Sequence, residues 1–163
     1  MAAGIGSRTI DKERNSLMER NYINCENFKK RMIELCLKSG LSDFPVKRRD
    51  QRILLKSIAI LFNPKHQYTE AEVNQRIIGW LKDMERFFQW DFMMLRRRLV
   101  DEKFLTRKTD GSGYRLCPPD PAEIIFDPAI DELDICQVIR EGEESIARKK
   151  EEYLQKQAVW LIN

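Results

Sequence analysis

The sequence predicts a mainly helical domain with one small antiparallel β-hairpin. Between residues 26 and 103, apolar residues recur at helical spacing in four segments. Near Phe104 the period of the pattern changes to two residues, which is typical of strands. The Asp110-Gly111 pair then lies between two extended segments, and this arrangement indicates a hairpin turn.

The first two helices are predicted over residues 11–25 and 26–39. The first is polar, with four apolar anchors: Leu17, Met18, Tyr22 and Ile23. The second has a continuous apolar stripe formed by Phe28, Met32, Leu35 and Cys36. Gly40 follows it and is expected to end it.

Three further helices are predicted over residues 47–62, 70–81 and 89–103. The first has a broad apolar face and a basic N-terminal half. The second begins at Thr69-x-x-Glu72, the spacing of a capping box. Asp91 is a candidate cap for the third, and its apolar face is Phe92, Leu95 and Leu99. The pattern does not decide whether residues 83–90 are helix or loop.

Two strands, 104–108 and 114–116, are predicted on either side of the turn. Prolines then recur along the chain up to Pro128, and this pattern predicts a linker. Residues 129–162 are predicted to form one long helix or two. Apolar residues recur there every seven positions, at Ile139, Ile146, Tyr153 and Trp160. The seam is narrow, so it suits docking on another surface.

Composition excludes several classes of function. No apolar run approaches the roughly 20 residues of a membrane span, and no basic-then-apolar leader opens the chain. The four cysteines have no C-x-x-C spacing, and His66 is the single histidine. We therefore expect reduced, partly buried thiols, no metal, no cofactor and no enzymatic activity, in a soluble cytoplasmic protein.

The net charge of +3 conceals an asymmetry. Residues 44–116 carry 16 Lys/Arg against 9 Asp/Glu, whereas residues 117–163 carry 5 against 11. The basic middle segment suits a polyanion. Packing of the basic surface on the acidic one, within a chain or across a dimer, is the alternative explanation.

The order of helix, capped helix, Arg-rich helix and hairpin is that of a winged helix-turn-helix. We predict this domain over residues 44–118. An N-terminal helical extension covers 1–43, and a linker with an acidic C-terminal helix covers 119–163. A helix of this kind fits the major groove of duplex DNA, and the hairpin beside it can contact the backbone.

Four sequence blocks support this prediction. They are Phe44-Pro45-x-Lys47, Tyr68-Thr69-Glu70-x-Glu72-Val73-Asn74, Leu95-Arg96-Arg97-x-Leu99-Val100-Asp101 and Leu105-x-Arg107-x-x-Asp110-Gly111-x-x-Tyr114. Together they resemble the uncharacterised bacterial family known as domain of unknown function 2087, over about residues 44–116. The resemblance implies a winged-helix-like fold in a regulatory setting and no established activity. The chain departs from the family pattern at Ile77 to Trp90, which adds about two helical turns.

The candidate nucleic-acid contacts lie on three elements. Consecutive helical residues point about 100° apart, so the three arginines cannot all face one partner. We expect Arg97 to face outward and Arg98 to lie to one side. Arg96 is expected to pair with Asp91 or Asp101. Arg107 and Arg115 are expected to point away from the core. The full candidate set is Arg97, Arg98, Arg107, Lys108, Arg115, Lys47, Arg48 and Arg49. For Lys47, Arg48, Arg49 and Arg52, a solvated face is the first explanation and phosphate contact is the alternative. Tyr114, Phe87, Phe88 and Trp90 are expected in the core; if Phe87, Phe88 and Trp90 were exposed, they would indicate a protein interface instead.

Two functions follow from this pattern. The first is a transcriptional regulator that binds duplex DNA as a homodimer through its terminal helices. The second is a protein-interaction module whose basic face docks an acidic partner. The continuity of the basic surface distinguishes them. A surface that runs continuously over residues 47–56, 96–98 and 107–115 favours the DNA-binding regulator. A surface covered by residues 129–163 favours the protein-interaction module.

Overall fold

The computed structural model describes residues 6–162, apart from the side chains of residues 6–8 and 16–20. Its α-helices are α1 (Gly6–Asn21), α2 (Cys25–Leu37), α3 (Arg48–Ala59), α4 (Glu70–Asp83), α5 (Phe92–Asp101) and α6 (Ile135–Ile162). Its strands are β1 (Tyr22–Ile23), β2 (Leu105–Arg107), β3 (Tyr114–Leu116) and β4 (Ile125–Phe126), and a 3-10 helix, η1, covers Pro128–Glu132. The predicted mainly helical fold with one antiparallel hairpin is confirmed.

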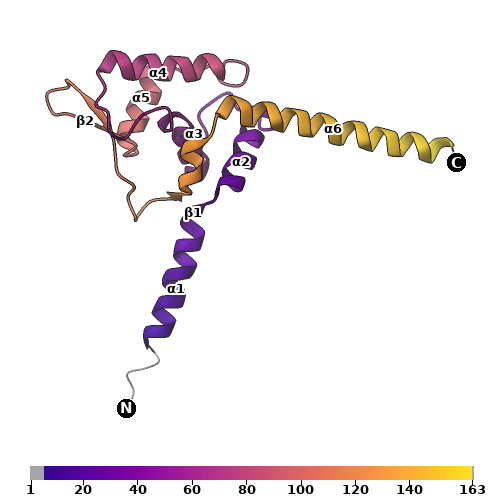
Figure 1. Ribbon diagram of the computed structural model, residues 1–163, viewed down its shortest axis with the longest axis horizontal. Coiled ribbons are helices and arrows are strands. Elements are labelled where there is room, and N and C mark those ends of the chain that lie inside the picture. The colour runs from indigo at the N-terminus through magenta and orange to yellow at the C-terminus, as the bar shows by residue number, and fades with distance from the viewer. Residues whose placement is uncertain (1–5, 163) are drawn as a thin grey trace.

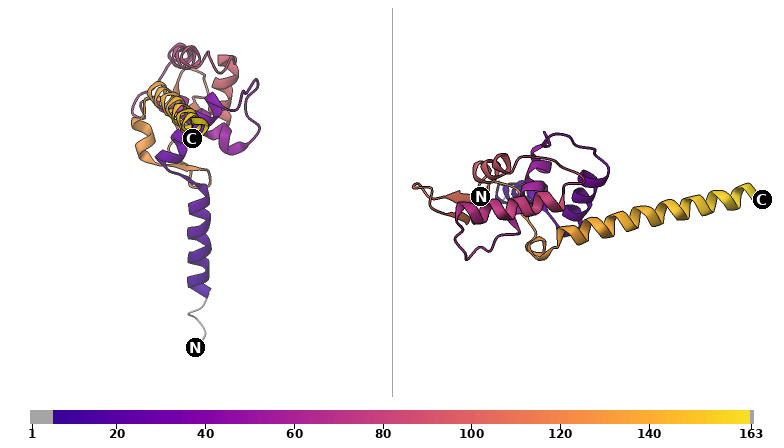
Figure 2. Two further views of the ribbon diagram at one scale, coloured as in Figure 1. Left: turned by 90° about the vertical axis from the view of Figure 1, so that its right-hand side faces the viewer. Right: turned by 90° about the horizontal axis from the view of Figure 1, so that it is seen from above.

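The molecule has a compact body from which two helices project (Figure 1). The body contains α2 to α5 and the β2–β3 hairpin. α1 leaves it in one direction, and the second half of α6 leaves it in another, on the side away from the hairpin. Two further views show the same arrangement (Figure 2).

Helix α2 is held by its cap and its apolar stripe. The Asn24 side chain accepts a hydrogen bond from the backbone N–H of Asn27 at 2.8 Å. Phe28, Met32, Leu35 and Cys36 are buried, as predicted. Gly40 follows with φ +58°, a conformation that glycine adopts without strain. The predicted preceding helix lies instead at 6–21, and two of its predicted anchors, Leu17 and Met18, fall outside the described side chains.

The capping box that starts α4 is present as predicted. The Thr69 hydroxyl accepts from the N–H of Glu72 at 3.2 Å, and the Glu72 carboxylate accepts from the N–H of Thr69 at 3.0 Å. Just before it, Tyr68 exchanges two backbone hydrogen bonds with Tyr114, at 2.9 and 2.8 Å. This antiparallel bridge ties the start of α4 to β3, which lies between β2 and Tyr68, so it adds a one-residue third strand that the sequence did not predict.

Residues 84–90, between α4 and α5, form a turn and an extended connector rather than helix. The aromatic residues of this segment pack inward. Phe88 stacks on Trp90 with ring centroids 4.3 Å apart and on Trp80 at 6.1 Å. Trp80 and Phe88 are buried and Phe87 and Trp90 are half-buried, so the predicted place of Phe87, Phe88 and Trp90 in the core is confirmed.

Helix α5 passes directly into the hairpin. Its last turn ends in a Schellman-type turn, in which the N–H of Phe104 donates to the carbonyl of Leu99 at 2.9 Å. Lys103 occupies the left-handed position of this turn, with φ +60°. β2 and β3 then pair antiparallel, with Leu105 opposite Leu116 and Arg107 opposite Tyr114.

The predicted linker contains a strand that sequence patterning missed. β4 pairs in parallel with β1, with Tyr22 opposite Ile125 and Ile23 opposite Phe126. Beside it, the Asp127 carboxylate accepts from the N–H of Cys25 at 3.2 Å. These contacts fasten the linker to the start of α2. Two-residue strands carry no periodic signal, which explains the omission.

The segment after β4 forms η1 and then α6. Gly142 permits close contact between α6 and α2, because a Cβ atom at this position would lie 2.6 Å from Ile33 Cγ1. Ile135, Val138 and Ile139 of α6 are buried against the body. Residues 147–162 are exposed.

One hydrophobic core draws on all three predicted parts of the chain. Its largest fully buried side chains are Phe28, Phe88, Ile23, Met32, Leu35, Ile53, Leu54, Leu55, Ile58, Ile77, Met84 and Leu95. α2 lies outside the predicted winged-helix boundaries, but its buried side chains form part of this core. The boundaries at residues 43 and 118 remain a prediction.

All four cysteines carry free thiols, as expected, and burial raises the pKa of the Cys36 thiol to about 12. Within residues 6–162, no helix combines the length and apolar character needed to cross a membrane.

Candidate nucleic-acid interface

Helix α5 presents one buried face and one open face. The Asp91 carboxylate caps it by accepting from the N–H of Met93 at 3.0 Å. Leu95 and Leu99 are fully buried beneath it. Met93 and Arg97 lie on the exposed face, and Arg97 makes no ion pair with any residue that the structure describes.

Arg96 is a structural arginine, as predicted, but its partner differs from the one expected. Its guanidinium lies 3.0 Å from the Glu70 carboxylate and donates to the Asn74 side-chain oxygen at 2.6 Å. Asp91 and Asp101 were the expected partners. α4 supplies the pairing groups because its first turns lie against α5.

Arg98 is turned away from Arg97 and is half-buried. Its guanidinium lies 4.3 Å from the centroid of the Phe44 ring, and its Nε donates to the Met94 sulfur at 3.2 Å. The three consecutive arginines therefore point in three directions. Of these, Arg97 is the one whose head group is free to meet a ligand.

The hairpin register separates its cations onto two faces. Directly opposed residues of an antiparallel pair share a face. Arg107 is opposite Tyr114 and faces α5, whereas Arg115 is opposite Thr106 and faces away. Lys108 follows Arg107 and by alternation shares the outer face with Arg115. Both arginines are exposed, and they lie on opposite faces of the hairpin.

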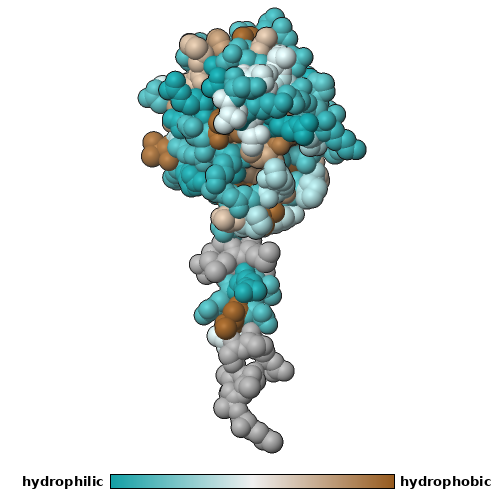
Figure 3. Space-filling model, turned by 90° about the vertical axis from the view of Figure 1, so that its left-hand side faces the viewer, coloured by the Kyte–Doolittle hydropathy of each residue, from teal (hydrophilic) through white to brown (hydrophobic). Residues whose placement is uncertain are grey.

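A groove of about 310 Å³ separates α5 from the hairpin. It is lined by Met93, Arg96, Arg97, Val100, Asp101, Arg107 and Tyr114. Tyr114 is buried, as predicted, and the Arg107 guanidinium lies 5.9 Å from its ring centroid. Arg107 also lies over the turn, because a Cβ atom on Gly111 would come within 2.8 Å of its Nη2. Figure 3 shows the molecule from the side of the hairpin, where the surface is mainly hydrophilic.

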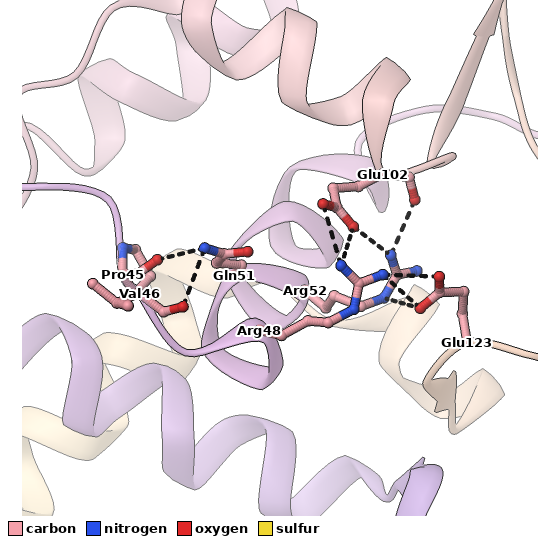
Figure 4. A network of polar contacts seen from close by, with 7 residues as sticks. All are labelled: Pro45, Val46, Arg48, Gln51, Arg52, Glu102 and Glu123. Atoms are coloured by element: carbon pink, nitrogen blue, oxygen red, sulfur yellow. Dashed lines mark hydrogen bonds and ion pairs between the residues drawn. The ribbon is translucent and has the colours of Figure 1, made fainter.

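The cations of α3 are largely engaged by carboxylates of the same chain (Figure 4). Arg48 makes a bidentate pair with Glu123, both bonds 2.8 Å long, and lies 3.1 Å from Glu102. The pair raises the pKa of Arg48 and lowers that of Glu123. Lys56 is bound to Asp131 at 2.8 Å. A phosphate contact by Arg48 would have to displace Glu123.

Arg52 is 5% exposed, so the expectation of a solvated face is wrong for this residue. Its Nη1 donates to the backbone carbonyl of Glu102 at 3.0 Å and lies 3.3 Å from the Glu102 carboxylate. The guanidinium also lies 4.4 Å from the centroid of the Phe104 ring. Arg52 thus holds the end of α5 on α3. Lys47 and Arg49, the other two cations of the helix start, are exposed.

The predicted basic surface is therefore divided in two. In the α3 part, Arg48, Arg52 and Lys56 are paired with Glu102, Glu123 and Asp131, whereas Lys47 and Arg49 are exposed. The part formed by α5 and the hairpin carries Arg97, Arg107, Lys108 and Arg115, none of which makes a close ion pair with a carboxylate in residues 6–162. α6 leaves the body on the other side and does not cover this part (Figure 1).

Sequence reasoning missed the residues that hold this interface in place. Glu70 and Asn74 bind the Arg96 guanidinium. Tyr68 holds β3 through a backbone bridge, and Glu123 forms an ion pair with Arg48. Glu70 and Asn74 lie four residues apart, so they share a helix face, and this spacing was the available signal. Glu123 carried no local signal, because its partner is 75 residues away in the chain.

The order of the elements is compatible with a winged-helix-like domain: a helix, a bridged strand, a capped helix, an exposed helix and a hairpin. Residues 40–116 of the chain match the family DUF2087, described as "uncharacterized protein conserved in bacteria", and this match confirms the resemblance inferred from the sequence motifs. This segment of the chain, a little under half of its length, is therefore similar to DUF2087. No curated protein and no solved structure matched the chain.

Proposed function

We propose that the protein is a non-enzymatic, cytoplasmic transcriptional regulator that binds duplex DNA through α5 and the hairpin. The observation that carries this proposal is a set of four cations on α5 and the hairpin that make no close ion pair within residues 6–162: Arg97, Arg107, Lys108 and Arg115. Arg97 and Arg107 also line the groove between these two elements. Cations left without internal partners are available for phosphate oxygens.

Under this proposal, the two faces of the hairpin make different contacts with DNA. Arg97 and Arg107 face each other across the groove, so they meet the same stretch of ligand. With α5 in the major groove, Arg97 is placed for a base edge, because it is exposed on the face opposite Leu95 and Leu99. Lys108 and Arg115 lie on the outer face and are placed for the phosphate backbone.

Homodimerisation through the terminal helices is a second part of the proposal. The apolar seam of α6 is uncovered beyond Ile146, and Tyr153 and Trp160 are exposed. Dimeric winged helices bind two half-sites, and the second half-site multiplies the affinity of the first.

A titration against mixed-sequence genomic DNA at several salt concentrations tests the DNA part. The logarithm of the binding constant should fall linearly with the logarithm of salt concentration, with a slope of about −0.9 per phosphate neutralised. Arg107→Ala should weaken binding to all sequences alike and flatten the slope by about one unit. Lys82→Ala is the matched control, because Lys82 is an exposed cation at the far end of α4. Absence of binding at ~50 mM salt would overturn the proposal.

The second candidate function is docking of an acidic protein partner. It is favoured by the α3 surface, where Glu123 and Asp131 show that carboxylates fit this basic face. Under this alternative, the protein fails to bind DNA and the Arg49→Ala variant, which removes an exposed cation of α3, loses affinity for acidic peptides. The same titration with a polyglutamate peptide distinguishes the two functions.

A further inference from the structure

The Glu123 carboxylate lies at the start of α3, against two arginine side chains (Figure 4). Arg48 Nη2 donates to both of its oxygens, each at 2.8 Å. Arg52 Nε lies 4.0 Å from one of these oxygens, which is too far for a hydrogen bond. Both arginines belong to α3, whereas Glu123 comes from the segment between β3 and β4. The start of α3 is thus a position at which the chain already binds an anion of its own.

Arg52 keeps an unused donor in this arrangement. Its Nη1 donates to the Glu102 carbonyl, but its Nε–H is buried and has no acceptor among the residues that the structure describes. A buried donor without an acceptor is costly. Both oxygens of the Glu123 carboxylate accept from Arg48, so the site offers one more donor than Glu123 uses.

A phosphate group matches these donors better than a carboxylate does. Its oxygens are arranged tetrahedrally and not in one plane, so one oxygen can accept from Arg48 while another accepts from Arg52. Guanidinium groups bind phosphate oxygens through the same charge-assisted hydrogen bonds that they form with carboxylates. Three exposed cations are neighbours of the site in the chain and add positive charge to this region: Lys47, Arg49 and Lys103.

The segment that carries Glu123 is attached to the body mainly at its ends, by β3 and by β4. Within the segment, the N–H groups of Ala122 and Glu123 donate to Asp120. Among the residues that the structure describes, Arg48 alone forms hydrogen bonds with residues 118–123 from outside the segment. Glu123 can therefore leave Arg48 without disrupting β4 or the hairpin.

We propose that the start of α3 is a further phosphate-binding site, that Glu123 closes it in the free protein, and that a phosphate of the DNA backbone replaces Glu123 when the protein binds duplex DNA. This inference rests on the proposed function and extends its interface. The end of α5 joins the two sites, because Asp101 lines the groove beside Arg97, and the next residue, Glu102, lies 3.1 Å from Arg48. The segment around Glu123 thus lowers the affinity of the protein for DNA.

DNA titrations of two neutralising variants test the competition. Glu123→Gln should raise the affinity for mixed-sequence duplex DNA about fivefold at a fixed salt concentration, because an amide competes for Arg48 far less than a carboxylate. Asp120→Asn is the matched control, since it removes one negative charge from the same segment and keeps the oxygen that accepts from Ala122. Asp120 is not paired with Arg48, so the control should raise the affinity by less than about twofold.

A double variant tests whether the gain depends on Arg48. In the Arg48→Ala background, the additional Glu123→Gln substitution should leave the affinity unchanged, because the two residues act as one pair. An equal gain with and without Arg48 would show a general charge effect and overturn the inference. Equal affinities of Glu123→Gln and Asp120→Asn would overturn it as well. Circular dichroism should show the same helix content in all these variants.

Titration with inorganic phosphate, followed by NMR, tests the site without DNA. In Glu123→Gln, the Nε–H signal of Arg52 should shift as phosphate is added, and it should shift less in the wild type, where Glu123 competes. A signal that does not shift in the variant would overturn the inference.

The two titrations separate failure of this inference from failure of the proposed function. DNA binding by the wild type with no gain in Glu123→Gln overturns the inference alone. Absence of DNA binding by every variant overturns the proposed function, and the phosphate titration then decides by itself whether the site at α3 exists.

Discussion

Arg96, Arg97 and Arg98 are neighbours in the chain, yet each head group has a different environment. Arg96 is tied to Glu70 and Asn74, Arg98 lies on the Phe44 ring, and Arg97 is exposed. A basic run of this kind cannot be treated as one patch. The pairing of each guanidinium decides which substitution affects stability and which affects binding.

Arg96→Ala should lower the free energy of unfolding by about 1 kcal/mol, because it removes a half-buried ion pair and a hydrogen bond to Asn74. Arg97→Ala should change it by less than ~0.5 kcal/mol, as is usual at exposed sites. Urea denaturation measures both. Equal losses for the two variants would contradict this assignment.

Arg97→Ala should have the larger effect on binding. If the side chain reads a base edge, the variant loses roughly 1–3 kcal/mol of binding free energy and relaxes its preference at one position of the site. Selection from a random-sequence DNA pool measures the preference. A uniform loss over all sequences would make Arg97 a phosphate contact instead.

At the scale of elements, α5 is held at both ends by polar groups of other segments. Asp91 caps its start, and Arg52 binds the Glu102 carbonyl at its end. Between its end and the hairpin, Lys103 adopts φ +60°, a left-handed conformation that costs a residue with a side chain roughly 1–2 kcal/mol.

Lys103→Gly should therefore stabilise the protein by about 1 kcal/mol, measured by urea denaturation. Lys103→Ala is the control, because it removes the same charge and keeps the strained conformation. If the alanine variant gains as much stability as the glycine variant, the charge of Lys103 and not its backbone is responsible.

The Arg48–Glu123 pair should make the attachment of the linker depend on pH. The pKa of Glu123 is lowered below its usual 4.5 by the hydrogen bonds from Arg48, so the folded protein favours the carboxylate. The stabilisation is present above pH 4.5 and is lost as pH falls through the lowered pKa. The Tm of wild type should exceed that of Glu123→Gln at pH 7, and the difference should disappear in acid. A difference that persists at pH 2 would contradict this mechanism.

Local signals were enough to predict much of the fold. The Thr69–Glu72 capping box, the Asp91 cap and the turn around Gly111 depend on residues a few positions apart, and each is present. The features that the sequence did not predict depend on distant partners. Pairing of β1 with β4, the burial of Arg52 and the choice of Glu70 by Arg96 follow from packing between elements. Which residues share a face of the hairpin depends on the register of its strands. Because the turn is longer than the tightest type, the sequence did not fix this register.

At the scale of the whole molecule, the two surfaces proposed for binding lie on different sides. The cations of α5 and the hairpin lie at one end, and the projecting half of α6 leaves from the other (Figure 1). A dimer formed through α6 therefore leaves both grooves accessible, which is what binding to two half-sites requires.

Hydrogen exchange should detect this assembly without any substitution. Backbone amides of residues 150–162 should exchange more slowly at high protein concentration than at low concentration, because pairing protects an otherwise isolated helix. Amides of α3 are buried in the monomer and should not depend on concentration. Equal exchange of the α6 amides at both concentrations would indicate that this half of the helix stays unpaired.

The contact of β1 with β4 also constrains the order in which the chain can fold. Ile23 and Phe126 meet across about a hundred residues, so this closure brings a large loop-entropy cost and must follow synthesis of the whole family segment. On the ribosome, α2 emerges after α1 and before the rest of the body, with Phe28 and Met32 still uncovered. Residues 40–116 emerge before Gly142 can bring α6 onto α2. We expect the nascent chain to hold an open, aggregation-prone intermediate until residues 125–142 have been released, so chaperone demand should be greatest late in synthesis.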